Sequence, residues 1–240
     1  AYRKNGQPAE AKKVYDAILG LKPEEKDAYF LRGSAELELG DYESAKADFD
    51  KAISMDPKNY DRLIEIYEAL ADYGYREVGQ EYLQNVLNTD KKLDTYDSGR
   101  IYYYLGDYQK AYLALEEAKG KGGVDSYLYL GKAYAATGDY NYASSVYSNY
   151  LSKQGPDAEI YNQLGLCELA KKDYQKALEA FQAGKQIEGN SLMQTLSFNE
   201  IVAYEYLQDY QKAAVLLKAY LQNYPDDQTA IREQQFLSTR

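Results

Sequence analysis

The side chains that usually carry acid and base chemistry near neutral pH are largely missing from this sequence. It holds no His, which excludes His-containing catalytic triads and imidazole metal ligands. Asp and Glu number 38, and a carboxylate pair could still serve a glycosidase. These acids fall largely on predicted helix surfaces and at helix caps. We therefore predict no catalytic residues, no metal site and no cofactor.

Two other features resemble reactive sites but are better explained by structure. The only cysteine, Cys167, stands two residues after Gly165 on a predicted helix, without a basic partner nearby in sequence. Such a cysteine is typically a small buried hydrophobe, and a single cysteine forms no internal disulfide. The segment Gly120-Lys121-Gly122-Gly123 lacks the spacing and the following Ser or Thr of a phosphate-binding loop. It is predicted to be a linker and the most flexible joint of the chain.

The overall charge limits the classes of partner. The formal charge is −10, which disfavours nucleic acid and anionic lipid surfaces. The charge is uneven, because residues 24–72 hold fourteen acidic against six basic side chains, whereas residues 1–23 hold five basic against two acidic. Hydrophobic residues make up 45%, which is typical of a folded globular protein. No nucleic-acid partner is predicted.

Localisation follows only weakly from the sequence. No apolar run reaches the roughly 18 residues that a transmembrane helix needs, and no signal peptide opens the chain. The chain lacks an initiator Met, and its repeat pattern starts within a helix, so we expect an upstream segment to have been removed. With one Cys and much Tyr and Asn, this slightly favours an exported or lipid-anchored bacterial protein. A cytoplasmic scaffold stays the alternative.

A short motif recurs along the whole chain. Leu39-Gly40-Asp41-Tyr42 returns in similar form at residues 105, 137, 171 and 207, and a weaker copy begins at residue 73. The period is about 34 residues, which is typical of one helical hairpin per repeat. Within the motif, Gly suits the end of a first helix and Asp can cap a second.

Small and bulky residues alternate in a helical pattern around each motif. After the Tyr comes a small residue, then an apolar one four positions later and another three after that, as in Ala45, Phe49 and Ala52. Each of four predicted first helices carries a glycine as its own small residue, preceded at one helical turn by Tyr. The four glycines are Gly33, Gly99, Gly131 and Gly165. We predict that the small residues let neighbouring helices approach closely.

This pattern resembles the tetratricopeptide repeat, whose aromatic and small positions fall in the same order. The resemblance implies an all-α fold, a right-handed α-solenoid of antiparallel helical hairpins over residues 1–240. The predicted parts are a truncated half repeat (1–23), six repeats (26–59, 60–91, 92–123, 124–157, 158–193 and 194–227) and a C-terminal capping helix (228–240). The match weakens in two repeats. Tyr67 and Gly79 stand where the family has Gly and Ala, and Ile201 stands where it has Gly, so we expect splayed joints there.

In proteins of this family the first helices line a groove that binds peptides, and the resemblance implies the same here. The projected face is acidic at its start, aromatic with two cations in the middle, and rich in amides near its end. The candidate binding residues are Tyr96, Arg100, Tyr103, Tyr104, Tyr129, Lys132, Phe198 and Asn199. Tyr and Arg often dominate binding energy. The Lys and Asn clamp by which some relatives hold a terminal carboxylate is absent, with Phe30, Ser34 and Glu65 among its positions.

Three functions fit these observations. The first is a non-catalytic scaffold that binds a protein or peptide partner whose identity the sequence does not reveal. The second is a structural solenoid that forms homo-oligomers through its terminal hairpins, because the opening half repeat exposes an apolar face. The third is an exported receptor for a sugar or cell-wall fragment that uses Tyr rings as stacking platforms, although the lack of Trp weakens this hypothesis.

Overall fold

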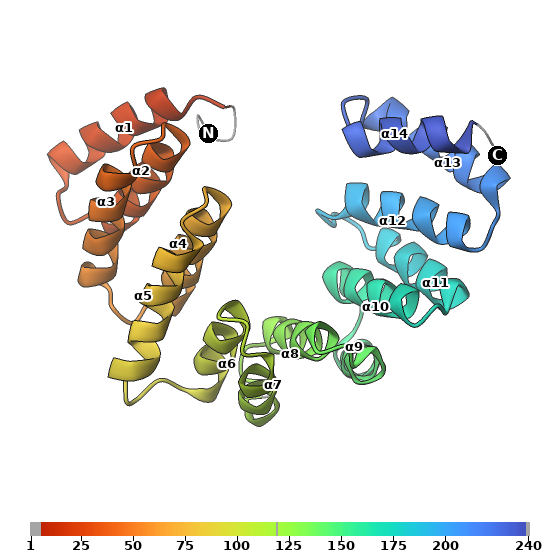
Figure 1. Ribbon diagram of the computed structural model, residues 1–240, viewed down its shortest axis with the longest axis horizontal. Helices are drawn as coiled ribbons and strands as arrows, with labels where there is room; N and C mark the ends of the chain where they lie inside the picture. The colour runs from red at the N-terminus through yellow and green to blue at the C-terminus, as the bar shows by residue number, and fades with distance from the viewer. Residues whose placement is uncertain (1–5, 119, 239–240) are drawn as a thin grey trace. The chain divides into compact units, whose positions relative to one another are not determined.

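The computed structural model describes residues 6–118 and 120–238, and in these ranges the chain forms fourteen α-helices and no strand (Figure 1). The all-α fold predicted from the repeat is therefore confirmed. The expected mid-helix start at residues 1–5 lies outside the described residues.

Helix packing divides the chain into two compact units, Ala1–Gly106 (unit 1) and Asp107–Arg240 (unit 2). Unit 1 contains α1 (Pro8–Leu21), α2 (Lys26–Glu38), α3 (Tyr42–Met55), α4 (Tyr60–Asp72), α5 (Arg76–Thr89) and α6 (Thr95–Tyr104). Unit 2 contains α7 (Tyr108–Glu117), α8 (Val124–Ala136), α9 (Tyr140–Gln154), α10 (Ala158–Ala170), α11 (Tyr174–Lys185), α12 (Met193–Tyr206), α13 (Tyr210–Asn223) and α14 (Gln228–Leu237). Within each unit every helix packs against the helices before and after it in sequence. A single continuous solenoid, with the repeat boundaries given above, stays a prediction.

The recurring motif forms the turn inside each hairpin. Asp41 caps α3 by accepting a hydrogen bond from the backbone N–H of Ser44, and the Asp of the later motif copies caps its own helix in the same way. Gly40 ends the first helix with a φ of +79°, in the left-handed region that favours glycine. Lys172 takes a φ of 65° where its motif copy lacks the glycine. The backbone turn is thus retained even where its preferred residue is not.

The glycines of the first helices allow the close approach that the sequence predicts. A Cβ added at Gly131 would lie 2.2 Å from the Cζ of Tyr147, and one added at Gly165 would lie 2.3 Å from the Cε1 of Phe181. Both rings are fully buried. In these hairpins the aromatic ring of the second helix fills the space left by the missing side chain.

The hairpin α4–α5, which carries the weakest copy of the motif, has the same packing, but the ring lies on its first helix and the glycine on its second. In the hairpin α4–α5, Tyr67 stands on the first helix and Gly79 on the second, and a Cβ at Gly79 would lie 2.9 Å from the Cδ2 of Tyr67. The ring therefore packs onto the glycine from the opposite side, and the two helices stay in close contact instead of splaying. In the last hairpin, Ile201 packs in one core cluster with Ala213 and Leu217, so two aliphatic side chains replace the glycine and the ring.

The last helix, α14, covers the end of the hairpin α12–α13. Ala230 and Leu237 of α14 are buried in the cluster that contains Ile201, Leu217 and Tyr220. Asp227 caps α14 by accepting from the backbone N–H groups of Thr229 and Ala230. The terminal hairpin thus has a cover for its apolar side, as repeat proteins require.

Candidate functional site

The first helices of the hairpins are α2, α4 and α6 in unit 1, and α8, α10 and α12 in unit 2. We call the side chains that these helices turn away from their second helices the first-helix face of each unit. Four of the predicted binding residues lie in unit 1 and four in unit 2. The unit 1 residues are Tyr96, Arg100, Tyr103 and Tyr104, and the unit 2 residues are Tyr129, Lys132, Phe198 and Asn199.

Arg62 joins α2 to α4 on the first-helix face of unit 1. Its guanidinium lies 4.0 Å from the ring centroid of Phe30. It also forms ion pairs at 2.9 Å with Asp27 of α2 and with Glu65 of its own helix. The cation is therefore held between a ring and two carboxylates, which fixes the relative position of the two helices on this face.

Arg100 repeats this arrangement one helix further along, between α4 and α6. Its two terminal nitrogens donate at 2.5 Å to Asp61 of α4 and to Asp97 of α6, and its guanidinium lies 4.5 Å from the ring centroid of Tyr96. The residue is only 7% exposed. Burial alone would lower the pKa of Arg100, but the hydrogen bonds to Asp97 and Asp61 outweigh burial and raise that pKa. Burial raises the pKa of Asp97.

Tyr103 and Tyr104 complete the unit 1 part of the predicted site. The hydroxyl of Tyr104 donates to Glu68 of α4 at 2.6 Å, and its ring meets Tyr67 edge to face with 5.3 Å between centroids. Tyr103 makes a similar edge contact with Tyr104 at 5.5 Å. Both rings are half-buried. They form one aromatic surface that is held in place by the neighbouring first helix.

In unit 2 the first-helix face is joined by weaker polar contacts between α8 and α10. Lys132 lies 3.5 Å from Glu159, and the side chains of both residues are about one-third exposed. Glu159 also accepts a hydrogen bond from Gln163 at 2.9 Å. Tyr129 is half-buried on α8, three residues before Lys132.

An amide pair joins α10 to α12. Asn199 donates to the side-chain oxygen of Asn162 at 2.9 Å, and Asn162 is only 5% exposed. Phe198, next in sequence, packs against Tyr220 with 5.7 Å between ring centroids. The Phe198 ring therefore supports the core of the last hairpin, and the amides of Asn162 and Asn199 supply the polar groups at this end of the face.

The contacts between first helices share one sequence signal. Their partners lie one repeat plus a few residues apart, as in Asp27–Arg62, Asp61–Arg100 and Asn162–Asn199. The helical spacing of Asp97 and Arg100 predicts their ion pair within α6, whereas the partners one repeat away become visible only when the repeats are aligned. For this reason the sequence does not reveal Arg62 as a member of the face, nor the partners of Asp61 and Asn162, which the helical projection does place on it.

The two cations expected in the aromatic part, Arg100 and Lys132, both lie beside carboxylates: Arg100 binds Asp61 and Asp97 in unit 1, and Lys132 lies 3.5 Å from Glu159 in unit 2. In unit 1, Arg62 is paired with carboxylates as well. The Arg100 side chain is 8% exposed, whereas that of its partner Asp61 is 76% exposed. The Arg62 side chain is 20% exposed, and those of Asp27 and Glu65 are 56% and 51% exposed. The two arginines are largely covered, whereas the carboxylates of Asp27, Asp61 and Glu65 face solvent, so the first-helix face of unit 1 is acidic at its surface.

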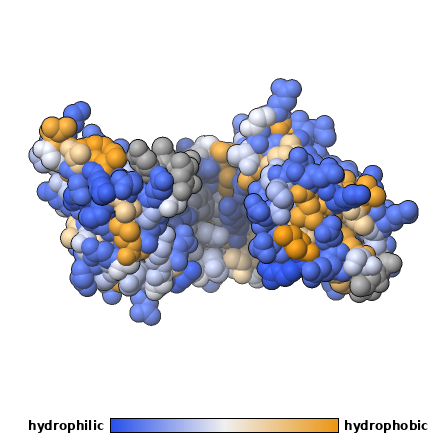
Figure 2. All heavy atoms as spheres, turned by 90° about the horizontal axis from the view of Figure 1, so that it is seen from above, coloured by the Kyte–Doolittle hydropathy of each residue, from blue (hydrophilic) through white to orange (hydrophobic). Residues whose placement is uncertain are grey.

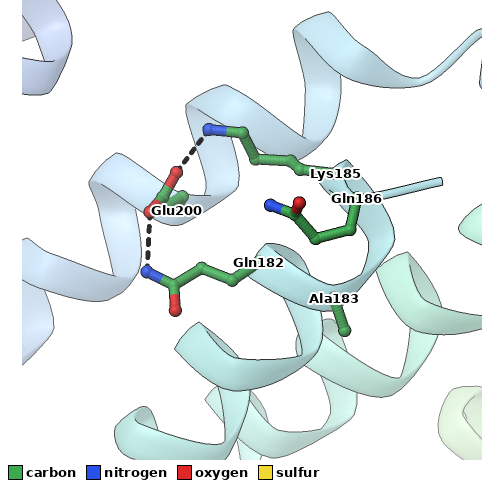
Figure 3. A pocket seen from close by; sticks show the side chains of 5 residues that line it. All are labelled: Gln182, Ala183, Lys185, Gln186 and Glu200. Atoms are coloured by element: carbon green, nitrogen blue, oxygen red, sulfur yellow. Dashed lines mark hydrogen bonds and ion pairs between the residues drawn. The ribbon is translucent and has the colours of Figure 1, made fainter. Parts of the chain in front are cut away.

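Unit 2 also contains a polar cavity of 390 Å³ between α11 and α12 (Figure 3). Glu200 is only 6% exposed and accepts hydrogen bonds from Lys185 at 2.5 Å and from Gln182 at 2.8 Å. The remaining lining residues are Ala183 and Gln186. Both oxygens of Glu200 are satisfied by the chain itself, so this network already performs a structural task, joining α11 to α12.

Three further features were searched for in the described part of the chain: a metal site, a reactive cysteine and a membrane-spanning helix. No group of three or more His, Cys, Asp and Glu side chains there is arranged to hold a metal ion. Cys167 is buried, and burial raises the pKa of its thiol to about 12, which disfavours the reactive thiolate. None of the described helices is long and apolar enough to cross a membrane.

Comparison with protein-family models gives the class. A tetratricopeptide repeat model matches residues 1–60 and 128–191, and a second tetratricopeptide repeat model matches residues 198–227. The chain belongs to the tetratricopeptide repeat (TPR) family. A search of the curated proteins gave no match.

Solved structures with a similar fold are many and distant in sequence. A chain in the crystal structure of the APC/C hetero-tetramer Cut9-Hcn1 is 18% identical to this chain, with a TM-score of 0.58, and the match covers 98% of this chain and 47% of that chain. A tetratricopeptide repeat protein from Parabacteroides merdae is 16% identical with a TM-score of 0.58, covering 84% of this chain and 80% of that one. YrrB is 18% identical with a TM-score of 0.51, covering 94% and 100%. At these identities the likeness shows the fold alone. Membership of the tetratricopeptide repeat family supports a protein-interaction scaffold in general.

Proposed function

We propose that this protein is a non-catalytic scaffold whose first-helix faces bind segments of partner proteins. The observation that carries the proposal is the row of contacts between successive first helices, from Asp27–Arg62 to Asp61–Arg100 in unit 1. These contacts hold exposed carboxylates and half-buried rings in fixed positions before any partner arrives. Preorganisation of this kind lowers the entropic cost of binding.

The charge of the face indicates the kind of segment that unit 1 binds. Because Arg100 and Arg62 are covered and paired, neither of these arginines favours a carboxylate on the partner. The exposed Asp27, Asp61 and Glu65 favour a segment with Lys or Arg among apolar side chains, which would lie on the rings of Tyr103 and Tyr104. One relative by fold, YrrB, is a TPR protein with an unusual peptide-binding site, which supports peptide recognition by this architecture.

Peptide selection followed by calorimetry tests the proposal. Peptides selected from a random displayed library on the full chain are titrated against Tyr103→Ala and Tyr129→Ala, one variant for each unit. We expect the variant of the unit that binds the peptide to lose about 2 to 4 kcal/mol of affinity, because aromatic anchors carry most of such binding energy.

Tyr140→Ala is the matched control, since Tyr140 is partly exposed at the start of the second helix α9. Thermal melts of each variant separate binding from folding. Equal affinities for all three variants would contradict binding on the first-helix faces, and a collapsed melting temperature for Tyr103→Ala would place that ring in the core instead.

Self-association is the second candidate, and one observation favours it. Tyr15, Ile18 and Leu31 line an apolar cavity of 380 Å³ between α1 and α2, where Leu21 is 86% exposed. Apolar side chains are visible on the face of unit 1 seen in Figure 2. Sedimentation of the wild-type chain against Leu21→Glu over a range of concentrations decides this candidate: a dimer that the variant abolishes supports it, and a wild-type monomer throughout contradicts it.

A further inference from the structure

Another cavity of unit 2, with a volume of 320 Å³, lies between the helices α9, α10 and α11. Tyr161, Leu164 and Glu168 line it from α10, and their spacings of three and four residues place them on one stripe of that helix. The stripe lies on the opposite side of α10 from Asn162, which belongs to the first-helix face. The cavity is therefore separate from the surface on which the proposed function depends.

Glu168 is the buried charged side chain in the lining of this cavity. It is only 5% exposed, and its Oε1 accepts a hydrogen bond from the Nζ of Lys171 at 2.8 Å. Its Oε2 is buried too, but has no hydrogen-bond partner in the described part of the chain. A buried carboxylate oxygen without a donor destabilises the folded state, because it has lost water without a replacement. The Oε2 of Glu168 thus requires a donor that the described residues do not supply.

The charges around the cavity leave one carboxylate in excess. Lys171 forms its ion pair with Glu168, and Lys176, which lines the cavity from α11, forms its ion pair with Asp173 at 2.7 Å. Glu179, the remaining charged residue of the lining, is exposed and accepts a hydrogen bond from a neutral amide. Three carboxylates thus stand against two ammonium groups. A ligand with one positive charge complements this arrangement.

We propose that this cavity binds an alkylammonium group, supplied by a lysine side chain of a partner protein or by a small alkylamine. The ammonium group donates to the Oε2 of Glu168, and its charge balances the excess carboxylate. Ser148 of α9 and Tyr161 of α10 bring hydroxyl groups to the lining, which can accept its other N–H bonds. The apolar side chains of the lining suit the alkyl chain; they are Leu164, Ala180 and Ala183.

Titration of the full chain, followed by nuclear magnetic resonance of its backbone amides, tests this site. The probe is N-acetyl-lysine amide, and the matched ligand is N-acetyl-norleucine amide, which has the same alkyl chain without the ammonium group. We expect the lysine derivative to shift amide signals of α10 and α11 with a Kd of about 1 mM. The norleucine derivative should bind at least about tenfold more weakly, because it leaves the Oε2 of Glu168 without a donor.

Butylamine, titrated in the same way, distinguishes the two sources of the ammonium group. Binding as tight as that of the lysine derivative supports a site for small amines, and weaker binding supports a site for a lysine side chain of a partner. Glu168→Gln keeps the shape of the side chain and removes its charge, so it should weaken binding of the lysine derivative at least about tenfold. Glu179→Gln, at an exposed position of the lining, should weaken it about two- to fivefold.

Glu188→Gln is the control variant, because Glu188 is an exposed glutamate of the same unit in the loop before α12, and it should bind the lysine derivative like the parent. The proposal is overturned if neither the lysine derivative nor butylamine binds, if the norleucine derivative binds equally well, or if Glu179→Gln and Glu188→Gln behave alike. Should Glu168→Gln lack the helical far-UV spectrum, the comparison of the two ligands and the Glu179→Gln variant still decide.

Discussion

The two units join their first helices with different side chains. In unit 1, Arg62 and Arg100 each stack on a ring and bind two carboxylates, and both guanidinium groups are largely covered. In unit 2, the equivalent contacts are the ion pair Lys132–Glu159, whose side chains are about one-third exposed, and the neutral amide pair of Asn162 and Asn199. Both solutions position one helix on the next. They leave different surfaces, acidic in unit 1 and amide-bearing in unit 2, so a partner of one unit need not suit the other.

The largest expected difference between the two units is the stability lost when one cation is removed from each. Arg100→Ala leaves Asp97 buried without its partner and removes the stacking on Tyr96, so we expect it to destabilise unit 1 by about 3 kcal/mol. Lys132→Ala removes a longer ion pair, about one-third exposed, and should cost about 0.5 kcal/mol or less. Urea unfolding followed by circular dichroism measures both. Similar losses for the two variants would show that the arginine is not the principal connection in unit 1.

The close contacts of unit 2 give the next largest effect. Gly131→Ala drives a methyl group into the buried ring of Tyr147, and we expect a loss of about 2 to 3 kcal/mol. Gly20→Ala is the matched control, because it lies in α1 and an added Cβ there meets nothing within 4 Å. This control should gain about 0.5 to 1 kcal/mol from better helix propensity. If Gly131→Ala melts like the wild type, the ring of Tyr147 moves more freely than its burial indicates.

Most of the fold could be predicted from sequence because it depends on local signals. The motif copies gave the turns, and Asp41 and its counterparts cap the second helices as the sequence predicts. The packing of Tyr67 on Gly79 was harder to predict, since the pattern assigns the ring and the glycine to particular helices whereas the core requires only that their volumes match. The pairing of Arg100 with Asp61 and of Asn162 with Asn199 was not predicted, because the members of such a pair lie one repeat apart and their register follows from how the helices stack.

The small residues of the second helices test whether both units follow the same repeat register. Ala45 in unit 1 and Ala177 in unit 2 are fully buried. Ala45→Leu and Ala177→Leu should each destabilise by roughly 1 to 3 kcal/mol, because the facing helix cannot make room for a larger side chain. Thermal melts give the result. The register would be wrong in any unit whose variant keeps the melting temperature of the parent.

The smallest effects separate charged from neutral contacts on the two faces. Asn199→Ala in unit 2 leaves the amide of the buried Asn162 without its partner, and we expect a loss of about 1 kcal/mol at any salt concentration, since the interaction is between neutral groups. Glu65→Ala in unit 1 removes an exposed carboxylate from Arg62 and should cost about 0.5 kcal/mol at low salt and almost nothing at about 1 M salt, where the screening length is a few ångströms.

Urea unfolding at two salt concentrations distinguishes these outcomes, with the wild type measured beside each variant so that general salt effects cancel. A salt-dependent loss for Asn199→Ala would mean that the amide pair is coupled to charges such as Glu159. A salt-independent loss for Glu65→Ala would mean that this carboxylate contributes by packing instead of charge. Either result would remove the electrostatic basis for assigning different partners to the two faces.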